Sequence, residues 1–165
     1  MRFEELIDRH HDEIYAYLWR LLGNERCSDA MRSVEDLVQE VFLRAYENFH
    51  SVRPDSNHRA WLYKIATNCA FTALRQIRKR RKSFLQWMHS PVAAEPHPAV
   101  QTMRRQLRAL VEQLPSKQKA GVTLRYLQDL DYAEIAAVLG CSEQTARANV
   151  SQALRRLRSA LKEER

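Results

Sequence analysis

The fold of this chain is decided by residues Leu130–Arg158, LDYAEIAAVLGCSEQTARANVSQALRRLR. The first part of this stretch has apolar residues at i, i+3, i+4 and i+7, which predicts a short amphipathic helix: Tyr132, Ile135, Ala136 and Leu139. Gly140 tolerates a positive φ, and Ser142 is a favoured N-cap, so a second helix is predicted to begin at Glu143. Two short helices joined by so tight a turn indicate a helix-turn-helix.

The second helix of this motif is predicted to have an apolar face and a basic face. Its inward positions are Ala146, Val150, Ala153, Leu157 and Leu161, and its outward positions are Gln144, Arg147, Ser151, Arg155 and Arg158. An ordinary helical hairpin with a solvated surface would show the same spacing. However, the segment from Gln144 to Lys162 holds five basic residues and no acid, whereas a merely solvated helix mixes both signs. The charge therefore favours a DNA-binding face.

Composition predicts an all-α protein with a polyanionic partner. The 165 residues include only three glycines and five prolines, and the formal net charge is +7. Residues 1–56 hold twelve acids and seven bases, whereas residues 57–165 hold eight acids and twenty bases. The net positive charge is thus concentrated in the C-terminal two thirds of the chain, and the N-terminal third is net negative.

The sequence argues against membrane, secreted, disulfide-rich and metal-binding proteins. No apolar run is long enough to span a membrane, and the acidic N-terminus does not resemble a signal peptide, so we expect a cytoplasmic protein without membrane insertion. Cys27, Cys69 and Cys141 are too scattered for a disulfide framework, and the six histidines never pair at ligand spacing. We therefore expect no metal, no cofactor and no catalytic residue.

The pattern along the chain predicts two small helical domains joined by a flexible linker. The first, residues 1–82, has three predicted helices: one ended by Gly23, one from Val34 to Phe49 with a broad apolar stripe that includes Tyr46, and a long third helix. Residues 83–100 hold three of the five prolines and predict a linker, whose apolar first part either docks on a domain or continues the third helix. Fully extended, it would span about 60 Å. In the second domain, residues 101–165, Pro115 ends one helix and Ser116 is expected to cap the next.

The third helix combines cations with aromatic side chains. Eight basic residues and no acid lie between Arg59 and Ala94, and Trp61, Tyr63 and Phe71 are interleaved with them. Cations bind nucleic-acid phosphates, and aromatic rings stack on unpaired bases. Trp61 could instead simply pack in the core. Part of the basic run Arg78–Lys82 could instead interact with the helix dipole at the C-terminal end of the helix. One face, opposite the predicted core, carries Lys64, Asn68, Phe71, Arg75 and Arg78.

These stretches resemble a known family. DLVQEVFLRAYENF (Asp36–Phe49) and WLYKIATNCAFTALRQIRKRR (Trp61–Arg81) resemble the second conserved region of bacterial RNA polymerase sigma factors, and Leu114–Arg158 resembles their fourth region. A chain with only these two regions resembles the extracytoplasmic-function group. The resemblance implies that region 2 occupies residues 1–82 and that region 4 occupies residues 101–165.

The resemblance also implies partners and site residues. Core polymerase would bind through the clamp coiled coil of its largest subunit and the flap region of its second-largest subunit, and the clamp would contact Asp36, Gln39, Glu40 and Leu43. The loop from His50 to Arg59 and the third helix would hold the minus-10 element of promoter DNA through Arg53, Asn57, His58, Arg59, Trp61, Tyr63, Lys64, Asn68, Arg75, Arg78, Lys79, Arg80 and Arg81. An anti-sigma factor is the usual further partner of this family.

The helix beginning at Glu143 would enter the major groove of the minus-35 element. The residues implied are Ser142, Glu143, Gln144, Thr145, Arg147, Ala148, Asn149, Ser151, Gln152, Arg155 and Arg156. Relatives commonly have arginine where Asn149 and Gln152 stand. Asn and Gln can read an adenine edge bidentately, so this difference predicts an altered sequence preference.

We therefore expect a sigma factor that binds core RNA polymerase, recognises a two-part promoter and assists DNA melting. The alternative is a stand-alone helix-turn-helix regulator whose N-terminal domain senses a ligand or forms a dimer. It predicts palindromic sites that the protein binds without polymerase.

Overall fold

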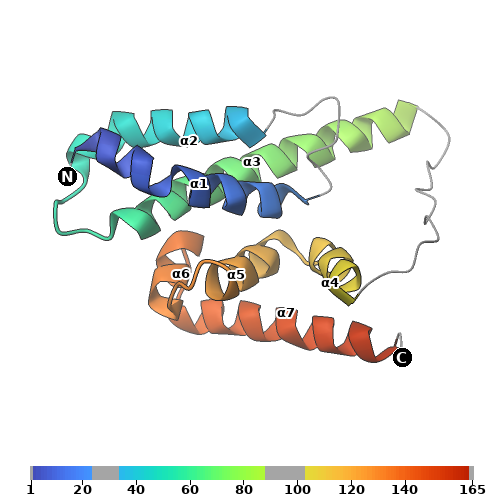
Figure 1. The fold of residues 1–165 in the computed structure, drawn as a ribbon. Helices are drawn as coiled ribbons and strands as arrows, with labels where there is room; N and C mark the ends of the chain where they lie inside the picture. The colour runs from blue at the N-terminus through green and yellow to red at the C-terminus, as the bar shows by residue number, and fades with distance from the viewer. Residues whose placement is uncertain (1, 24–33, 88–102, 164–165) are drawn as a thin grey trace.

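The computed structural model describes residues 2–23, 34–87 and 103–163, and all regular elements within these ranges are helical (Figure 1). The N-terminal bundle consists of α1 (Phe3–Leu22), α2 (Val34–Asn48), a 3₁₀ turn (Phe49–Ser51) and α3 (His58–Trp87). The C-terminal bundle consists of α4 (Met103–Glu112), α5 (Ser116–Tyr126), α6 (Tyr132–Leu139) and α7 (Glu143–Glu163). The described part of the chain contains no strand, so the all-α prediction is confirmed.

The core of the N-terminal bundle lies between α1, α2 and α3, which all contact one another. Each helix contributes an apolar face, with Leu18 of α1, Val41 of α2 and Leu62 of α3 completely buried. Two buried tyrosines also link the helices: the Tyr17 and Tyr63 rings meet edge to face with centroids 5.1 Å apart. The Tyr17 hydroxyl lies 2.8 Å from the Thr67 hydroxyl, which donates to the Tyr63 carbonyl. This polar chain is satisfied internally, so its burial carries no desolvation penalty for unpaired groups.

The C-terminal bundle is organised around α7, which contacts α4, α5 and α6. Gly140 has the predicted positive φ, at 63°, and ends α6. The Ser142 hydroxyl accepts a hydrogen bond from the Thr145 backbone N–H at 3.1 Å, as expected of an N-cap. On the inner face of α7 the predicted residues Ala146, Val150, Ala153 and Leu157 are buried, whereas Leu161 is only half-buried. Val138 of α6 is buried in addition.

The helices differ from two of the sequence predictions and decide a third. The cap predicted at Ser116 is wrong: Pro115 occupies the N-cap position with an extended ψ of 145°, which leaves Ser116 inside the first turn. Tyr46 is 58% exposed because the apolar stripe of α2 is wider than the face that α1 and α3 cover. Helix α3 runs through Trp87, so of the two alternatives for the start of the linker, continuation of the helix is confirmed. The predicted linker residues 88–100 and Cys27 lie outside the described residues.

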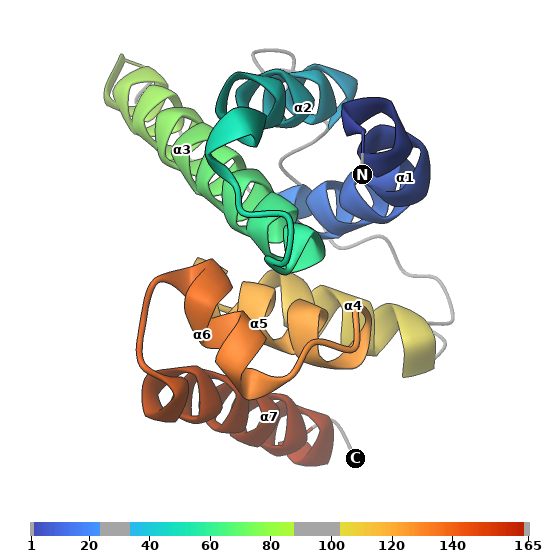
Figure 2. The same ribbon diagram turned by 90° about the vertical axis from the view of Figure 1, so that its left-hand side faces the viewer.

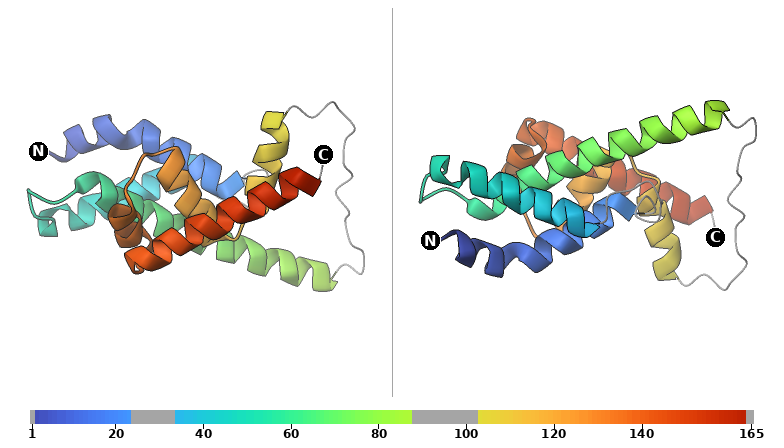
Figure 3. Two further views of the ribbon diagram at one scale, coloured as in Figure 1. Left: turned by 90° about the horizontal axis from the view of Figure 1, so that it is seen from below. Right: turned by 90° about the horizontal axis from the view of Figure 1, so that it is seen from above.

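The two bundles pack against each other through α3 with α6 and α1 with α5. Viewed from the side, α6 lies between α3 and α7 (Figure 2). Buried residues of both bundles join in one continuous apolar cluster, which includes Leu18 and Tyr63 from the first bundle and Leu130 and Ile135 from the second. Views from below and above show α7 and α3 running past each other on opposite sides of α5 and α6 (Figure 3).

Candidate nucleic-acid and polymerase interfaces

The outer face of α7 carries the residues predicted to read the minus-35 element. All of them are exposed except Asn149, which is half-buried. Arg147 already has local partners, because it donates to Glu143 at 2.7 Å and its guanidinium lies 4.4 Å from the centre of the Tyr132 ring. Gln152 accepts a hydrogen bond from Gln118 at 3.1 Å. These contacts hold two of the candidate DNA-reading side chains in defined positions before any DNA binds.

A second polar surface follows the exposed side of α3. One hollow of about 590 Å³ lies between α2 and α3 and is lined by Arg44, Glu47, Asn48, Ser51, Trp61, Ile65 and Asn68. Another, of about 550 Å³, continues along α3 and is lined by Asn68, Phe71, Thr72, Leu74, Arg75, Arg78, Ser116 and Lys117. Asn68 borders both hollows, so together they form a path along the helix, which we call the α3 path. Its cations, amides and aromatic edges suit a single strand of nucleic acid.

Most of the predicted minus-10 residues lie on or beside the α3 path. Asn68, Arg75 and Arg78 are exposed along it, and Trp61 is half-buried at its start. Lys64 is exposed one turn before Asn68 on the same helix. The basic run continues with Lys79, Arg80 and Arg81, which are also exposed. Arg53 is exposed in the preceding loop, and His58, the first residue of α3, is half-buried. The sequence therefore brings these side chains to one side of the N-terminal bundle, opposite its core.

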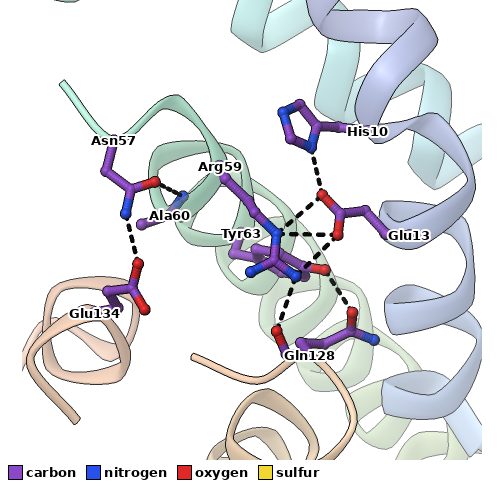
Figure 4. Close-up of polar contacts among 8 residues, drawn as sticks. All are labelled: His10, Glu13, Asn57, Arg59, Ala60, Tyr63, Gln128 and Glu134. Carbon is purple, nitrogen blue, oxygen red and sulfur yellow. Dashed lines mark hydrogen bonds and ion pairs between the residues drawn. The ribbon is translucent and has the colours of Figure 1, made fainter. Parts of the chain in front are cut away.

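Three of the predicted minus-10 residues, Asn57, Arg59 and Tyr63, lie instead where the two bundles meet (Figure 4). Tyr63 is fully buried, and its hydroxyl donates to Gln128 Oε1 at 2.7 Å. Burial raises the pKa of Tyr63, so it remains a neutral hydroxyl donor at physiological pH. In this conformation Tyr63 cannot contact DNA, because α3 turns it toward the core while Lys64 faces outward.

Arg59 is bound on two sides. Its Nε and Nη2 both lie 3.0 Å from Glu13 Oε2, and Nη2 also donates to the Gln128 carbonyl at 2.8 Å. Burial by itself would raise the pKa of Glu13, but the hydrogen bonds from Arg59 and His10 outweigh burial and hold that pKa below its ordinary value of 4.5. Glu13 is therefore a carboxylate at neutral pH, and the guanidinium joins α1, α3 and the loop before α6.

The polymerase-binding residues predicted on α2 lie on its outer side. Asp36 and Gln39 are exposed, Glu40 is half-buried and accepts from Arg44 at 2.6 Å, and Leu43 is 64% exposed. Tyr46, one turn beyond Leu43, belongs to the same surface, and its ring packs on Phe3 with centroids 5.2 Å apart. Sequence reasoning missed Tyr46 because its spacing matches the apolar stripe. An exposed leucine and tyrosine flanked by acids form the most apolar part of this surface, which suits protein binding.

Other chemistry finds little support in the described residues. They contain no group of three metal-binding side chains. None of their helices is long and apolar enough to cross a lipid bilayer. Two separate polar surfaces on an all-helical scaffold, one of them a helix-turn-helix, are typical of a DNA-binding protein with two contact sites.

Comparison with known proteins assigns a family to each half of the chain. Residues 6–82 match the family described as Sigma-70 region 2, and residues 104–157 match Sigma-70, region 4. The chain is 27% identical to the ECF RNA polymerase sigma factor SigW of Bacillus subtilis, over 98% of this chain and 89% of that protein. It is 33% identical to the ECF RNA polymerase sigma-E factor of Escherichia coli K12, over 73% and 69% of the two chains. Among solved structures, the sigma factor RpoE in complex with the anti-sigma factor NepR from Bartonella quintana is similar, with a TM-score of 0.71, 25% identity, and coverage of 99% and 98%.

The chain belongs to the extracytoplasmic-function group of the sigma-70 family of RNA polymerase sigma factors. Its function is to bind RNA polymerase and recognise promoters in transcription initiation, and it is not an enzyme. Family membership decides between the two hypotheses from the sequence, in favour of the sigma factor over the stand-alone regulator.

Proposed function

We propose that the two bundles divide promoter recognition between them. The N-terminal bundle, within residues 1–82, binds the minus-10 element and the clamp coiled coil of core polymerase. The C-terminal bundle, within residues 101–165, binds the minus-35 element and the flap region, and residues 83–100 connect the two. The observation that carries this proposal is the presence of two separate DNA-compatible surfaces, the α3 path and the outer face of α7.

The α3 path supports binding of a melted strand. Its width is bounded by α2 on one side and by the start of α5 on the other. Trp61 lies where a base leaving the duplex could stack, while Lys64 and Arg75 lie where the following phosphates would pass. A strand held in this way is removed from the duplex, so the same surface that recognises the minus-10 element also assists melting.

The outer face of α7 supports major-groove binding. Its first turn is capped by Ser142 and projects Gln144 and Arg147 from the helix-turn-helix. Arg155 and Arg156 are exposed two turns further along, where a recognition helix passes the DNA backbone. Asn149 and Gln152 lie between these two groups and provide amide groups for base edges.

We also propose that an anti-sigma factor binds this chain in the cytoplasm. The similar RpoE structure contains such a partner. A groove of about 480 Å³ between the two bundles, lined in part by Trp19, Leu107, Val111 and Leu127, offers an apolar surface for it. Leu127 is 57% exposed. An inhibitor seated there would contact both bundles at once.

Run-off transcription with purified core polymerase tests the proposal. Specific initiation on a promoter fragment should require this protein. Leu43→Ala should weaken core binding, whereas Lys64→Ala combined with Asn68→Ala should leave core binding intact and reduce open-complex formation. Leu107→Ala serves as a matched control in this assay, which contains no anti-sigma factor, since Leu107 is an exposed leucine outside all the polymerase and DNA residues named above. If Lys64→Ala with Asn68→Ala opened promoters as well as the unaltered protein does, the assignment of the α3 path would be wrong.

A further inference from the structure

A side-chain contact between α5 and α7 lies behind the outer face of the recognition helix. The Gln118 Nε2 group donates to Gln152 Oε1 at 3.1 Å. Gln118 belongs to α5 and is only 6% exposed, whereas Gln152 is exposed on α7. The contact therefore joins a side chain from the interior of the C-terminal bundle to one that faces solvent, where α5 packs against α7 (Figure 1).

The two helices approach each other closely beside this contact. Gly121, one turn after Gln118 on α5, packs against Val150 of α7, and a Cβ atom on residue 121 would lie 3.2 Å from Val150 Cγ2. Glycine is suited to such a close approach because it has no Cβ atom. The short distance between the helices lets the amide of Gln118 reach Gln152 from within the bundle.

The hydrogen bond also fixes which end of the Gln152 amide faces outward. Gln152 Oε1 is turned toward Gln118, so the NH2 group, on the other branch of the planar amide, is turned away from α5. Gln118 Oε1 is buried and has no hydrogen-bond partner among the described residues. Buried N–H groups without a partner are rarer in proteins than such carbonyl oxygens, which favours the orientation in which the Gln118 NH2 group makes the bond.

The outward end of an amide decides which bases it can read. In the major groove adenine N7, guanine N7 and O6, and thymine O4 are acceptors, whereas cytosine offers only the N4 donor. An outward NH2 group can donate to the first three bases but cannot accept from the fourth. A glutamine without a fixed partner can turn its amide over and present its oxygen to cytosine instead.

We propose that Gln118 is a positioning residue for promoter recognition, which holds the Gln152 amide with its NH2 group toward the DNA and so excludes cytosine at the base that Gln152 contacts. The proposal rests on the proposed binding of the minus-35 element by the outer face of α7. Gln118 is buried and acts on the DNA only through Gln152. Holding Gln152 before DNA binds also reduces the side-chain entropy that is lost on binding.

Two measurements on the free, full-length protein do not depend on promoter binding. Gln118→Met keeps the approximate shape of the side chain and removes a buried oxygen without a partner, so the melting temperature should stay unchanged or rise. In protein labelled with ¹⁵N-glutamine, the Gln118 side-chain amide signal, identified by its loss in Gln118→Met, should shift in Gln152→Ala and not in Gln113→Ala. Gln113 is exposed in the loop before α5. An unchanged Gln118 signal in Gln152→Ala would show that the contact does not form, whether or not α7 binds the minus-35 element.

Transcription by the reconstituted holoenzyme, from a promoter randomised in its minus-35 element, tests the effect on recognition. The position at which Gln152→Ala changes the base preference identifies the base that Gln152 contacts. The unaltered protein should use cytosine there roughly 5-fold less well than the best base, or worse. Gln118→Met should relax this discrimination at that position alone, and Gln113→Met should leave it unchanged.

The outcomes separate failure of the positioning role from failure of the proposed function. A preference for cytosine in the unaltered protein, or equal preferences in Gln118→Met and Gln113→Met, would overturn the positioning role and leave the binding of the minus-35 element by α7 intact. If Gln152→Ala and Arg147→Ala both changed no base preference, the proposed binding of the minus-35 element would be wrong, and the role of Gln118 would fall with it.

Discussion

The hydrogen bond at the N-cap of α7 lets us predict how much the Ser142 hydroxyl contributes to the free energy of unfolding. The Ser142 hydroxyl accepts from the Thr145 backbone N–H at 3.1 Å and also lies 2.8 Å from the Thr145 hydroxyl. Ser142→Ala removes this acceptor, so that the Thr145 backbone N–H can bind only water. Both residues are exposed, so water compensates in part, and the expected loss of unfolding free energy is about 1 kcal/mol.

Urea and thermal unfolding followed by circular dichroism measure this loss. For a protein of this size, 1 kcal/mol corresponds to a decrease in melting temperature of about 2–4 °C. Ser142→Gly is the matched control, because glycine at an N-cap costs only a few tenths of a kcal/mol relative to serine. The first two turns of α7 carry Gln144 and Arg147, so Ser142→Ala should weaken binding to a minus-35 duplex more than Ser142→Gly does.

Two results would refute this reasoning. Equal destabilisation by alanine and glycine would contradict the N-cap assignment, because an N-cap position tolerates glycine better than alanine. Unchanged stability in Ser142→Ala together with abolished DNA binding would show that Ser142 contacts DNA directly and contributes nothing as a cap.

Three further predictions concern charge and backbone conformation. The pKa of Glu13 is held below 4.5 in the folded protein, so its stabilising effect is complete above the pKa of the unfolded chain and is lost as pH falls through the lowered value. The difference in unfolding free energy between the unaltered protein and Glu13→Gln should therefore be constant near neutral pH and shrink in acid, and a difference that grew in acid would contradict the ion pair with Arg59. Replacing Arg78–Arg81 with glutamine should flatten the plot of the logarithm of the promoter-opening constant against the logarithm of salt concentration. The slope should fall by about 0.7 for each phosphate that the protein no longer neutralises, and Arg2→Gln should leave it unchanged. Gly140 has a φ of 63° with no atom near its missing Cβ, so Gly140→Ala should cost about 1–2 kcal/mol through backbone strain alone. Gly140→Asn should cost less, and chemical denaturation can compare the two.

The helices and the outer face of α7 could be predicted because their signals are local. A period of 3.6 residues, a glycine at positive φ and a serine cap all lie within a few residues of the structure that they determine. The prediction that Ser116 caps α5 was wrong for an equally local reason. Pro115, one residue before Ser116, also adopts the extended conformation of an N-cap. Tyr46 shows a different limit, since periodicity identifies a face of α2 but not how much of that face other helices cover.

The candidate sites could be predicted only in part. The cations of α3 that face outward, such as Lys64 and Arg75, follow from their position opposite the core. The partners of Arg59 and Tyr63 do not, because Gln128 is separated from them by 69 and 65 residues. No short pattern in the sequence links a polar residue before α6 with the start of α3. Such a contact appears only when the two bundles are placed against each other.

If polymerase binds only an arrangement in which the two bundles are separated, the contact of Arg59 and Tyr63 with Gln128 sets how much protein is needed for a response. A partner that binds only the open form has an apparent dissociation constant equal to its intrinsic value divided by the open fraction. If about 1% of the protein is open, the apparent dissociation constant rises about a hundredfold. About a hundredfold more sigma factor or core polymerase is then needed to form the same amount of holoenzyme. Substitutions at Gln128 would change this threshold without altering any side chain on the polymerase-binding face of α2 or the outer face of α7. The dose at which a cell activates its target promoters could thus evolve independently of which promoters are read.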